Sequence, residues 1–140
     1  MAKSDVAVEY FDSGFNCSAS VFASFCEDYD VDTEVATMLA CGLGGGCGAG
    51  EICGAVSGAI LVVGLKYGQN IEGDIGTKKN CYAKASQVRD AFKEKNGALT
   101  CRDLLADTWE LDKEEGKTLR RKLCTGFVKT AAEILEELEY

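Results

Sequence analysis

Histidine and proline are both absent from this 140-residue chain. Without histidine, the chain cannot form a c-type haem attachment motif or a His-ligated zinc site, and imidazole cannot serve as a general base. Without proline, the turns and helix ends depend on glycine, of which the chain has 16. Any chemistry must therefore come from other side chains.

Basic residues and long apolar runs are also scarce. The chain has 15 Lys and Arg against 23 Asp and Glu, a net charge of −8, which argues against a nucleic-acid partner because phosphate binding needs clustered cations. The longest apolar stretch, Ile52–Leu65, is shorter than the ~20 residues of a membrane-spanning helix. The first ten residues include Asp5 and Glu9 and lack the apolar core of a secretory signal. We therefore expect a cytoplasmic protein without a membrane segment.

Cysteine is abundant, with eight residues in the chain. Stable disulfides are rare in the cytoplasm, where the thiol pool keeps cysteines reduced. Metal binding or redox chemistry is therefore the preferred interpretation.

The hydrophobic pattern predicts an all-α fold, a compact bundle of about five to seven helices in a single domain over residues 1–140. We expect helices over Asn16–Asp28, Asp32–Leu39, Ile52–Leu65 and Thr77–Lys95, and a last helix capped by Thr125. The last helix has an apolar face of Phe127, Val128, Ala131, Ile134, Leu135 and Leu138. No segment alternates as a strand does.

Four cysteines fall at predicted helix starts: Cys17, Cys53, Cys101 and Cys124. Asn16 and Thr100 are the expected caps before two of them. A helix N-terminus offers free N–H donors and a partial positive charge, which lower a thiol's pKa. If these four starts converge, they form a pocket for a negatively charged cofactor held by cysteine.

A glycine-rich loop leads into the central buried helix. Its residues Gly44, Gly45, Gly46, Gly48 and Gly50 could expose successive N–H groups as an anion-binding nest. The loop lacks the GK[ST] ending of a phosphate loop, and its sole nearby charge, Glu51, is acidic. A cluster or a thiolate-reactive substrate is the favoured guest, and a tight turn between helices is the alternative. Within the helix, Gly54 and Gly58 either admit a close neighbour or fill a tight core.

The remaining cysteines differ in context. Cys41 and Cys47 flank or occupy the glycine loop and are candidates for additional ligands or redox partners. Their spacing matches neither ferredoxins nor zinc ribbons. Cys26 and Cys81 lie on apolar helix faces, which favours a structural role for each thiol.

Several blocks of the chain together resemble a known family, the redox-active family named for its C, GCAxxG, C, C cysteine pattern. The blocks are GFNCSASVF from Gly14, the glycine loop with its helix from Gly42 to Gly68, CRDLL from Cys101, and the segment after Cys124. The resemblance assigns the family's four cysteines to Cys17, Cys53, Cys101 and Cys124. The second block departs from the family name, since it reads CGAxxG.

The family is also similar to the non-haem domain of split-Soret cytochromes, which are dimeric and carry an additional iron centre. That similarity implies an iron–sulfur cluster and a homodimer.

We therefore expect a protein that binds an iron–sulfur cluster through cysteine, for electron transfer with an unidentified partner protein or for a reductive reaction. One alternative is a thiol–disulfide oxidoreductase or redox sensor without metal, in which Cys53 attacks and Cys47 or Cys17 resolves. Another is a structural module whose cysteines hold zinc or simply pack.

Overall fold

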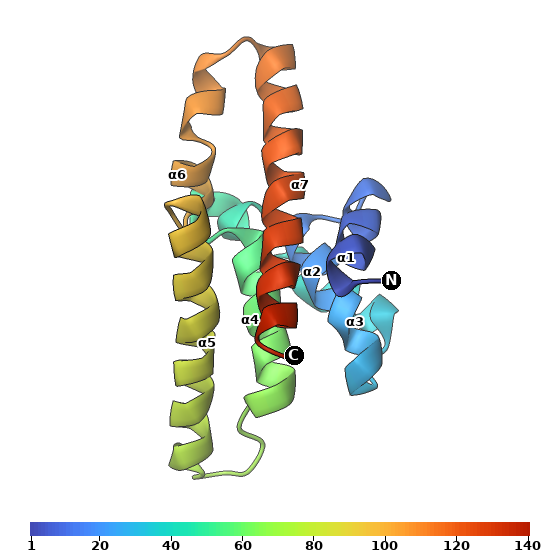
Figure 1. Ribbon diagram of the computed structural model, residues 1–140, viewed down its shortest axis with the longest axis vertical. Helices are drawn as coiled ribbons and strands as arrows, with labels where there is room; N and C mark the ends of the chain where they lie inside the picture. Colours follow the sequence, from blue (N-terminus) through green and yellow to red (C-terminus); the bar gives the residue numbers. More distant parts are fainter.

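The computed structural model describes residues 1–140 and is all-α, as the sequence predicts (Figure 1). Two short 3-10 helices, η1 (Glu27–Tyr29) and η3 (Ala106–Glu110), and the glycine-rich segment η2 (Gly46–Gly50) connect the α-helices. The seven α-helices are α1 (Lys3–Asp12), α2 (Cys17–Cys26), α3 (Thr33–Cys41), α4 (Gly54–Tyr67), α5 (Ile75–Asn96), α6 (Cys101–Leu104) and α7 (Lys113–Glu137).

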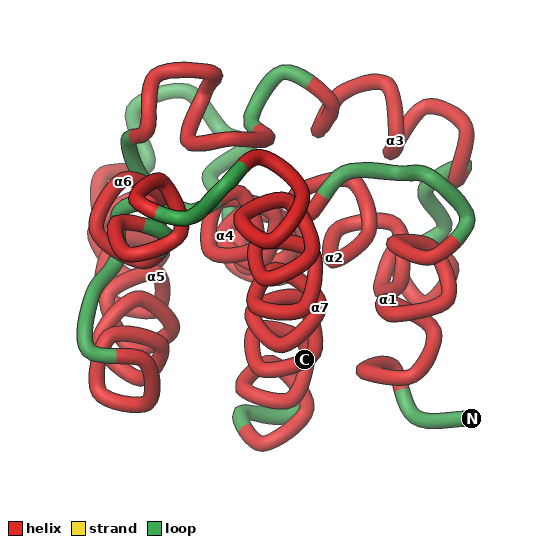
Figure 2. The backbone as a smooth tube through the Cα atoms, turned by 90° about the horizontal axis from the view of Figure 1, so that it is seen from above, coloured by secondary structure: helices red, strands yellow, loops and turns green.

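The helices are arranged around α4, α7 and α2. Seen from above, α5 lies on one side of the molecule and α1 on the other, with these three helices between them (Figure 2). Helix α2 packs against α1, α3 and α4, while α7 packs against α1, α2, α4 and α5. The glycine-rich segment, α6 and the beginning of α4 lie at one level of the molecule, beside the middle of α7 (Figure 1).

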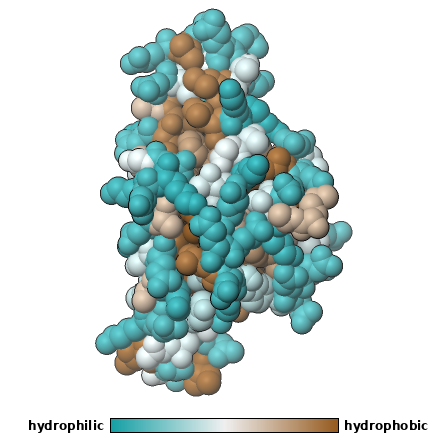
Figure 3. Space-filling view, viewed as in Figure 1, coloured by the Kyte–Doolittle hydropathy of each residue, from teal (hydrophilic) through white to brown (hydrophobic).

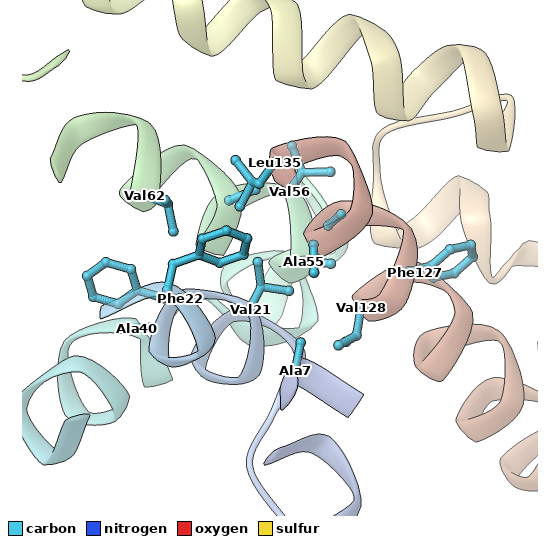
Figure 4. Packing of buried hydrophobic residues seen from close by; sticks show 14 of the residues in the cluster. Ala7, Val21, Phe22, Ala40, Ala55, Val56, Val62, Phe127, Val128 and Leu135 are labelled. Atoms are coloured by element: carbon cyan, nitrogen blue, oxygen red, sulfur yellow. The ribbon is translucent and has the colours of Figure 1, made fainter. Parts of the chain in front are cut away.

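Small residues allow α2 and α4 to pack closely at the centre. Nine of the ten residues of α2 are buried, and the buried Ser18 donates a hydrogen bond to the Ala40 carbonyl oxygen at 2.7 Å. A Cβ on Gly58 would lie only 2.5 Å from the Ser18 carbonyl oxygen, so the close approach of the two backbones requires glycine. Val21 and Val56 belong to the core that forms around this crossing (Figure 4).

Local sequence signals account for several of the helix ends. The Asn16 side chain caps α2 by accepting a hydrogen bond from Ala19 N at 3.0 Å, and Asp32 caps α3 in the same way. Gly97 ends α5 with a φ of +83°, in the left-handed conformation that favours glycine. The glycine loop does precede a buried helix, α4.

Two helix starts differ from the sequence prediction. Helix α1 was not predicted, although its buried Ser4, Ala7 and Phe11 have helical spacing. The last helix begins at Lys113 instead of near Thr125, because Asp112 caps it by accepting a hydrogen bond from Glu115 N at 3.0 Å. Asp followed three residues later by Glu is a signal that could have located this start.

The surface is mixed in polarity. No helix has both the length and the apolar character needed to cross a membrane. Hydrophobic surface is visible at the end of the molecule that carries the α4–α5 connection, where Ile71 and Ile75 are exposed (Figure 3).

Candidate functional site

The four cysteines selected from the sequence line one cavity, of about 130 Å³, which we call the thiol cavity. They come from α2, the start of α4, α6 and α7. Apart from the four thiols the lining has no polar side chain. The residues that line it are Cys17, Gly45, Cys53, Gly54, Cys101, Leu104, Leu105, Cys124 and Phe127.

Glycine at position 54 makes room for the first of these thiols. A Cβ on Gly54 would collide with Cys17 Sγ and would lie 3.2 Å from the Leu43 carbonyl oxygen. The expectation that a small residue here admits a close neighbour is therefore confirmed, and the neighbour is a thiol of the same cavity.

A short antiparallel bridge positions the next two cysteines. Cys53 N donates to the Leu99 carbonyl oxygen at 2.8 Å, and Cys101 N donates to the Glu51 carbonyl oxygen at 2.7 Å. Ile52 and Thr100 form an isolated β-bridge between these bonds. The backbone thus joins two cysteine-bearing segments that the whole α4–α5 hairpin separates in sequence. The sequence pattern gave no indication of this bridge because it is too short to show alternation.

Cys124 reaches the cavity differently from the prediction. It lies within α7 and not at a helix start, and Thr125 does not cap a helix. The Thr125 hydroxyl instead donates back to the Arg121 carbonyl oxygen at 2.9 Å. Cys17 and Cys101 are the first residues of their helices and Cys53 is an N-cap, so three of the four predicted helix starts are confirmed.

The glycine loop adopts an unusual backbone path. Gly45, Gly46, Cys47, Gly48 and Gly50 all have a φ between +59° and +72°, in the left-handed region. Gly45 is the single loop residue that lines the thiol cavity, and it also lines an outer cleft together with Gly48 and Gly50. Gly44 instead lies against Asn16, and Gly46 lies against the Glu51 backbone.

Burial changes the acidity of the cavity thiols in the direction opposite to the sequence expectation. Burial, together with the nearby Cys17, raises the pKa of Cys53 to about 12, although the Ala55 and Val56 N–H groups act in the other direction. Burial and the neighbouring thiols also raise the pKa of Cys124, to about 11, and that of Cys101. Without a bound metal these three thiols are protonated at neutral pH.

The outer cleft adjoins the thiol cavity and has a volume of about 960 Å³. The two share Gly45, Cys101, Leu105 and Cys124 in their linings. Four cationic side chains line the outer cleft: Arg102, Lys117, Arg120 and Arg121. Sequence reasoning missed this feature because the cations come from α6 and α7 and surround the loop only in the folded chain.

Arg102 also changes the environment of the loop. Its guanidinium donates to the Ala49 carbonyl oxygen at 3.2 Å and to Glu51 Oε1 at 3.4 Å. The sequence interpretation of Glu51 as the sole nearby charge is therefore wrong, since the acid is paired and the cleft beside the loop is basic.

The other four cysteines lie outside the thiol cavity. Cys41 and Cys47, the candidates for additional ligands, are exposed and line neither the cavity nor the outer cleft. Cys26 is buried and its thiol donates to the Phe22 carbonyl oxygen at 3.2 Å, as expected of a structural residue. Cys81 is half-buried and packs against the core. All eight thiols are free.

The arrangement of the four cavity thiols suits some metal groups better than others. No three His, Cys, Asp or Glu side chains lie close enough to hold a single metal ion. A mononuclear tetrahedral site needs all its sulfurs about 2.3 Å from one centre, whereas in a cluster the cysteines bind different iron atoms and lie further apart. The four cavity cysteines supply the all-thiolate donor set that iron–sulfur clusters use.

The chain matches one known family. A family model described as "Putative redox-active protein (C_GCAxxG_C_C)" matches residues 15–138. The matched segment includes every residue that lines the thiol cavity. Searches of curated proteins and of solved structures returned no match.

Proposed function

This chain belongs to the redox-active protein family with the C, GCAxxG, C, C cysteine pattern, and from that premise we propose that its thiol cavity binds an iron–sulfur cluster. The observation that carries the proposal is the convergence of four thiols from four helices on one otherwise apolar cavity. The ligands would be Cys17, Cys53, Cys101 and Cys124. The cluster would supply one-electron chemistry, for electron transfer or for a reductive reaction.

The acidity of the thiols supports a metal-dependent function. Thiolate is the form that binds metal, and coordination deprotonates a thiol outright. A raised pKa therefore does not prevent metal binding, although it makes the binding release protons. The chain's own contribution is to hold the sulfurs in place and to exclude water, with Leu105 and Phe127 as apolar walls.

The raised pKa values of the cavity thiols disfavour a metal-free thiol–disulfide enzyme. Such an enzyme needs an attacking thiolate, and reactive cysteines have a lowered pKa in partly exposed, electropositive surroundings. Cys53, the proposed attacking residue, is 6% exposed and has its pKa raised to about 12. Of the two proposed resolving partners, Cys17 lines the same cavity and Cys47 does not.

Anaerobic purification from iron-replete cells tests the proposal directly. The protein should be brown, and it should contain iron and acid-labile sulfide in stoichiometric amounts. A colourless preparation without iron contradicts the cluster. One zinc per chain would instead indicate a structural metal site, and a disulfide between cavity cysteines after mild oxidation of the metal-free protein would indicate thiol–disulfide chemistry.

The proposal also includes the cell compartment and the assembly. Eight free thiols are consistent with the reducing cytoplasm. For the homodimer that the resemblance implies, Val35, Met38 and Leu39 of α3 supply an exposed apolar stripe at helical spacing. Sedimentation should show a dimer that Met38→Glu dissociates. A wild-type monomer at micromolar concentration would exclude the homodimer without affecting the cluster assignment.

A further inference from the structure

The outer cleft concentrates positive charge in a protein whose net charge is −8. Four of the chain's 15 Lys and Arg residues line it, against one acidic residue, Glu114. A basic surface is unexpected on a chain with a net negative charge. Because a concave basic surface concentrates anions, this cleft is a candidate anion-binding site.

Two of the four cations have no acidic partner. Lys117 and Arg120 form no ion pair, whereas Arg102 pairs with Glu51 at 3.4 Å and Arg121 with Asp12 at 3.6 Å. Aromatic and backbone groups hold two of these guanidinium groups. Arg120 lies 3.8 Å above the Trp109 ring, and Arg121 lies 4.1 Å above the Phe11 ring and donates to the Phe11 carbonyl oxygen at 2.9 Å. These contacts hold the two guanidinium groups in position, and Arg120 has no acidic partner to compete with a ligand.

The cleft opens onto the thiol cavity. Cys101 and Cys124 line both, so a molecule in the cleft would contact two of the proposed cluster ligands. The volume of about 960 Å³ lies in the range of small-molecule sites.

We propose that the outer cleft binds a small organic anion that carries carboxylate or phosphate groups, and that it holds this anion beside Cys101 and Cys124. The inference deepens the proposed function, on which it rests, by naming the class of substrate for the same centre. A concave site favours a small molecule over an acidic protein, which the chain's net negative charge would repel at longer range.

Trp109 provides the readout, because it is the only tryptophan in the chain and lines the cleft. Full-length protein, both as isolated anaerobically and after metal removal, is titrated with citrate and separately with pyrophosphate. Trp109 fluorescence and calorimetry both follow binding. We expect saturable binding of at least one anion, and the comparison of the two distinguishes a carboxylate site from a phosphate site.

Charge-matched variants test where the anion binds. Lys117→Gln with Arg120→Gln should raise the Kd about tenfold or more, since the double variant loses two charged hydrogen-bond donors to the anion. Lys78→Gln with Lys79→Gln, a change of equal charge at exposed positions of α5, should change it less than about twofold. Lys117→Glu is a single exposed change that retains the Arg120–Trp109 stack, and it should weaken binding at least as much as the double variant.

The proposal is overturned if wild-type protein shows no saturable binding, or if both charge-matched pairs weaken it equally. It is also overturned if citrate and pyrophosphate fail to bind while poly-glutamate binds in a Lys117-dependent way, since the cleft would then dock an acidic protein. Iron and sulfide are measured in the same samples. Anion binding without iron retains the anion site and rejects the cluster. Iron and sulfide without anion binding retain the cluster and reject the anion site.

Discussion

At the scale of single residues, the cavity cysteines differ in how their surroundings act on the thiol. Cys53 is 6% exposed, and its sulfur accepts hydrogen bonds from two backbone N–H groups at the start of α4. Cys124 instead lies within a helix, near the positive charges of Arg120 and Arg121. In both, burial outweighs the groups that favour the thiolate. A helix start alone is therefore insufficient to predict a reactive cysteine.

Paired serine substitutions separate a cluster ligand from a core thiol. Cys53→Ser should abolish or strongly reduce iron and sulfide per chain, since the thiolate ligand is lost. Cys26→Ser, with the same chemical change in the core, should retain the iron while losing about 1–3 kcal/mol of stability. Metal analysis and chemical denaturation measure the two effects. Equal iron in both variants would remove Cys53 from the ligand set.

The raised thiol pKa values predict how the stability of the metal-free protein depends on pH. Between the ordinary thiol pKa of 9.0 and the folded value of about 12 for Cys53, the unfolded chain binds fewer protons than the folded protein. The free energy of unfolding contributed by this group should thus be fully present below about pH 9 and fall as the pH rises further. Urea unfolding at several pH values measures this slope.

Cys53→Ala is the control for the pH effect. Its slope above pH 9 should be shallower than that of the wild type, because the titrating group is absent. Cys124, with its pKa raised to about 11, would still contribute. Identical slopes for the two proteins would contradict the burial of an ionisable thiol at position 53.

Cys47 has a backbone conformation that favours another residue. Its φ of 59° lies in the left-handed region, between glycines with similar values. Cys47→Gly should leave the free energy of unfolding unchanged or raise it by up to ~1 kcal/mol, because glycine adopts this conformation without a Cβ penalty. Iron content should not change, since the residue is outside the thiol cavity. Loss of iron would show that Cys47 is a ligand after all.

At the scale of helices, α4 contains two glycines with opposite roles. A Cβ on Gly58 would meet the Ser18 backbone of α2, whereas one on Gly64 would meet nothing within 4 Å. Gly58→Ala should destabilise the protein by ~1–3 kcal/mol through overpacking. Gly64→Ala, in the exposed part of the same helix, should stabilise it by about 0.5–1 kcal/mol through helix propensity. Chemical denaturation measures both, and equal effects would contradict the close crossing of α2 and α4.

The helices could be predicted from the sequence more completely than the contacts between them. Helical periodicity and local caps such as Asn16 and Asp32 located most of the helices, because these signals depend on residues near one another in the chain. The four cysteines were selected correctly as neighbours, although the reason given for Cys124 was wrong. The Ile52–Thr100 bridge and the basic cleft depend on tertiary contacts, which no local pattern reports.

At the scale of the whole molecule, a bound cluster would join four helices that are otherwise held together by packing and by the antiparallel bridge between Ile52 and Thr100. A ligand that binds the folded state stabilises it by mass action. Removing iron with a chelator under anaerobic conditions should lower the Tm by about 5–10 °C for a chain of this size. Circular dichroism during heating measures the shift.

The Cys53→Ser variant provides the control for the chelator experiment. Its Tm should be insensitive to chelation, because it holds no cluster to remove. A chelator that lowers the Tm of both proteins equally would be acting on something other than the thiol cavity.

The antiparallel bridge that joins residues 51–53 to residues 99–101 allows the α4–α5 hairpin to change in length without moving the cysteines. It fixes the separation of Cys53 and Cys101 at the base of the α4–α5 hairpin, so that separation does not depend on the hairpin's length. Gly73 lies in the connection at the hairpin's far end and is exposed. A flexible insertion at this position, such as an epitope tag, should therefore be tolerated, and relatives with longer or shorter hairpins could retain the same cysteine geometry.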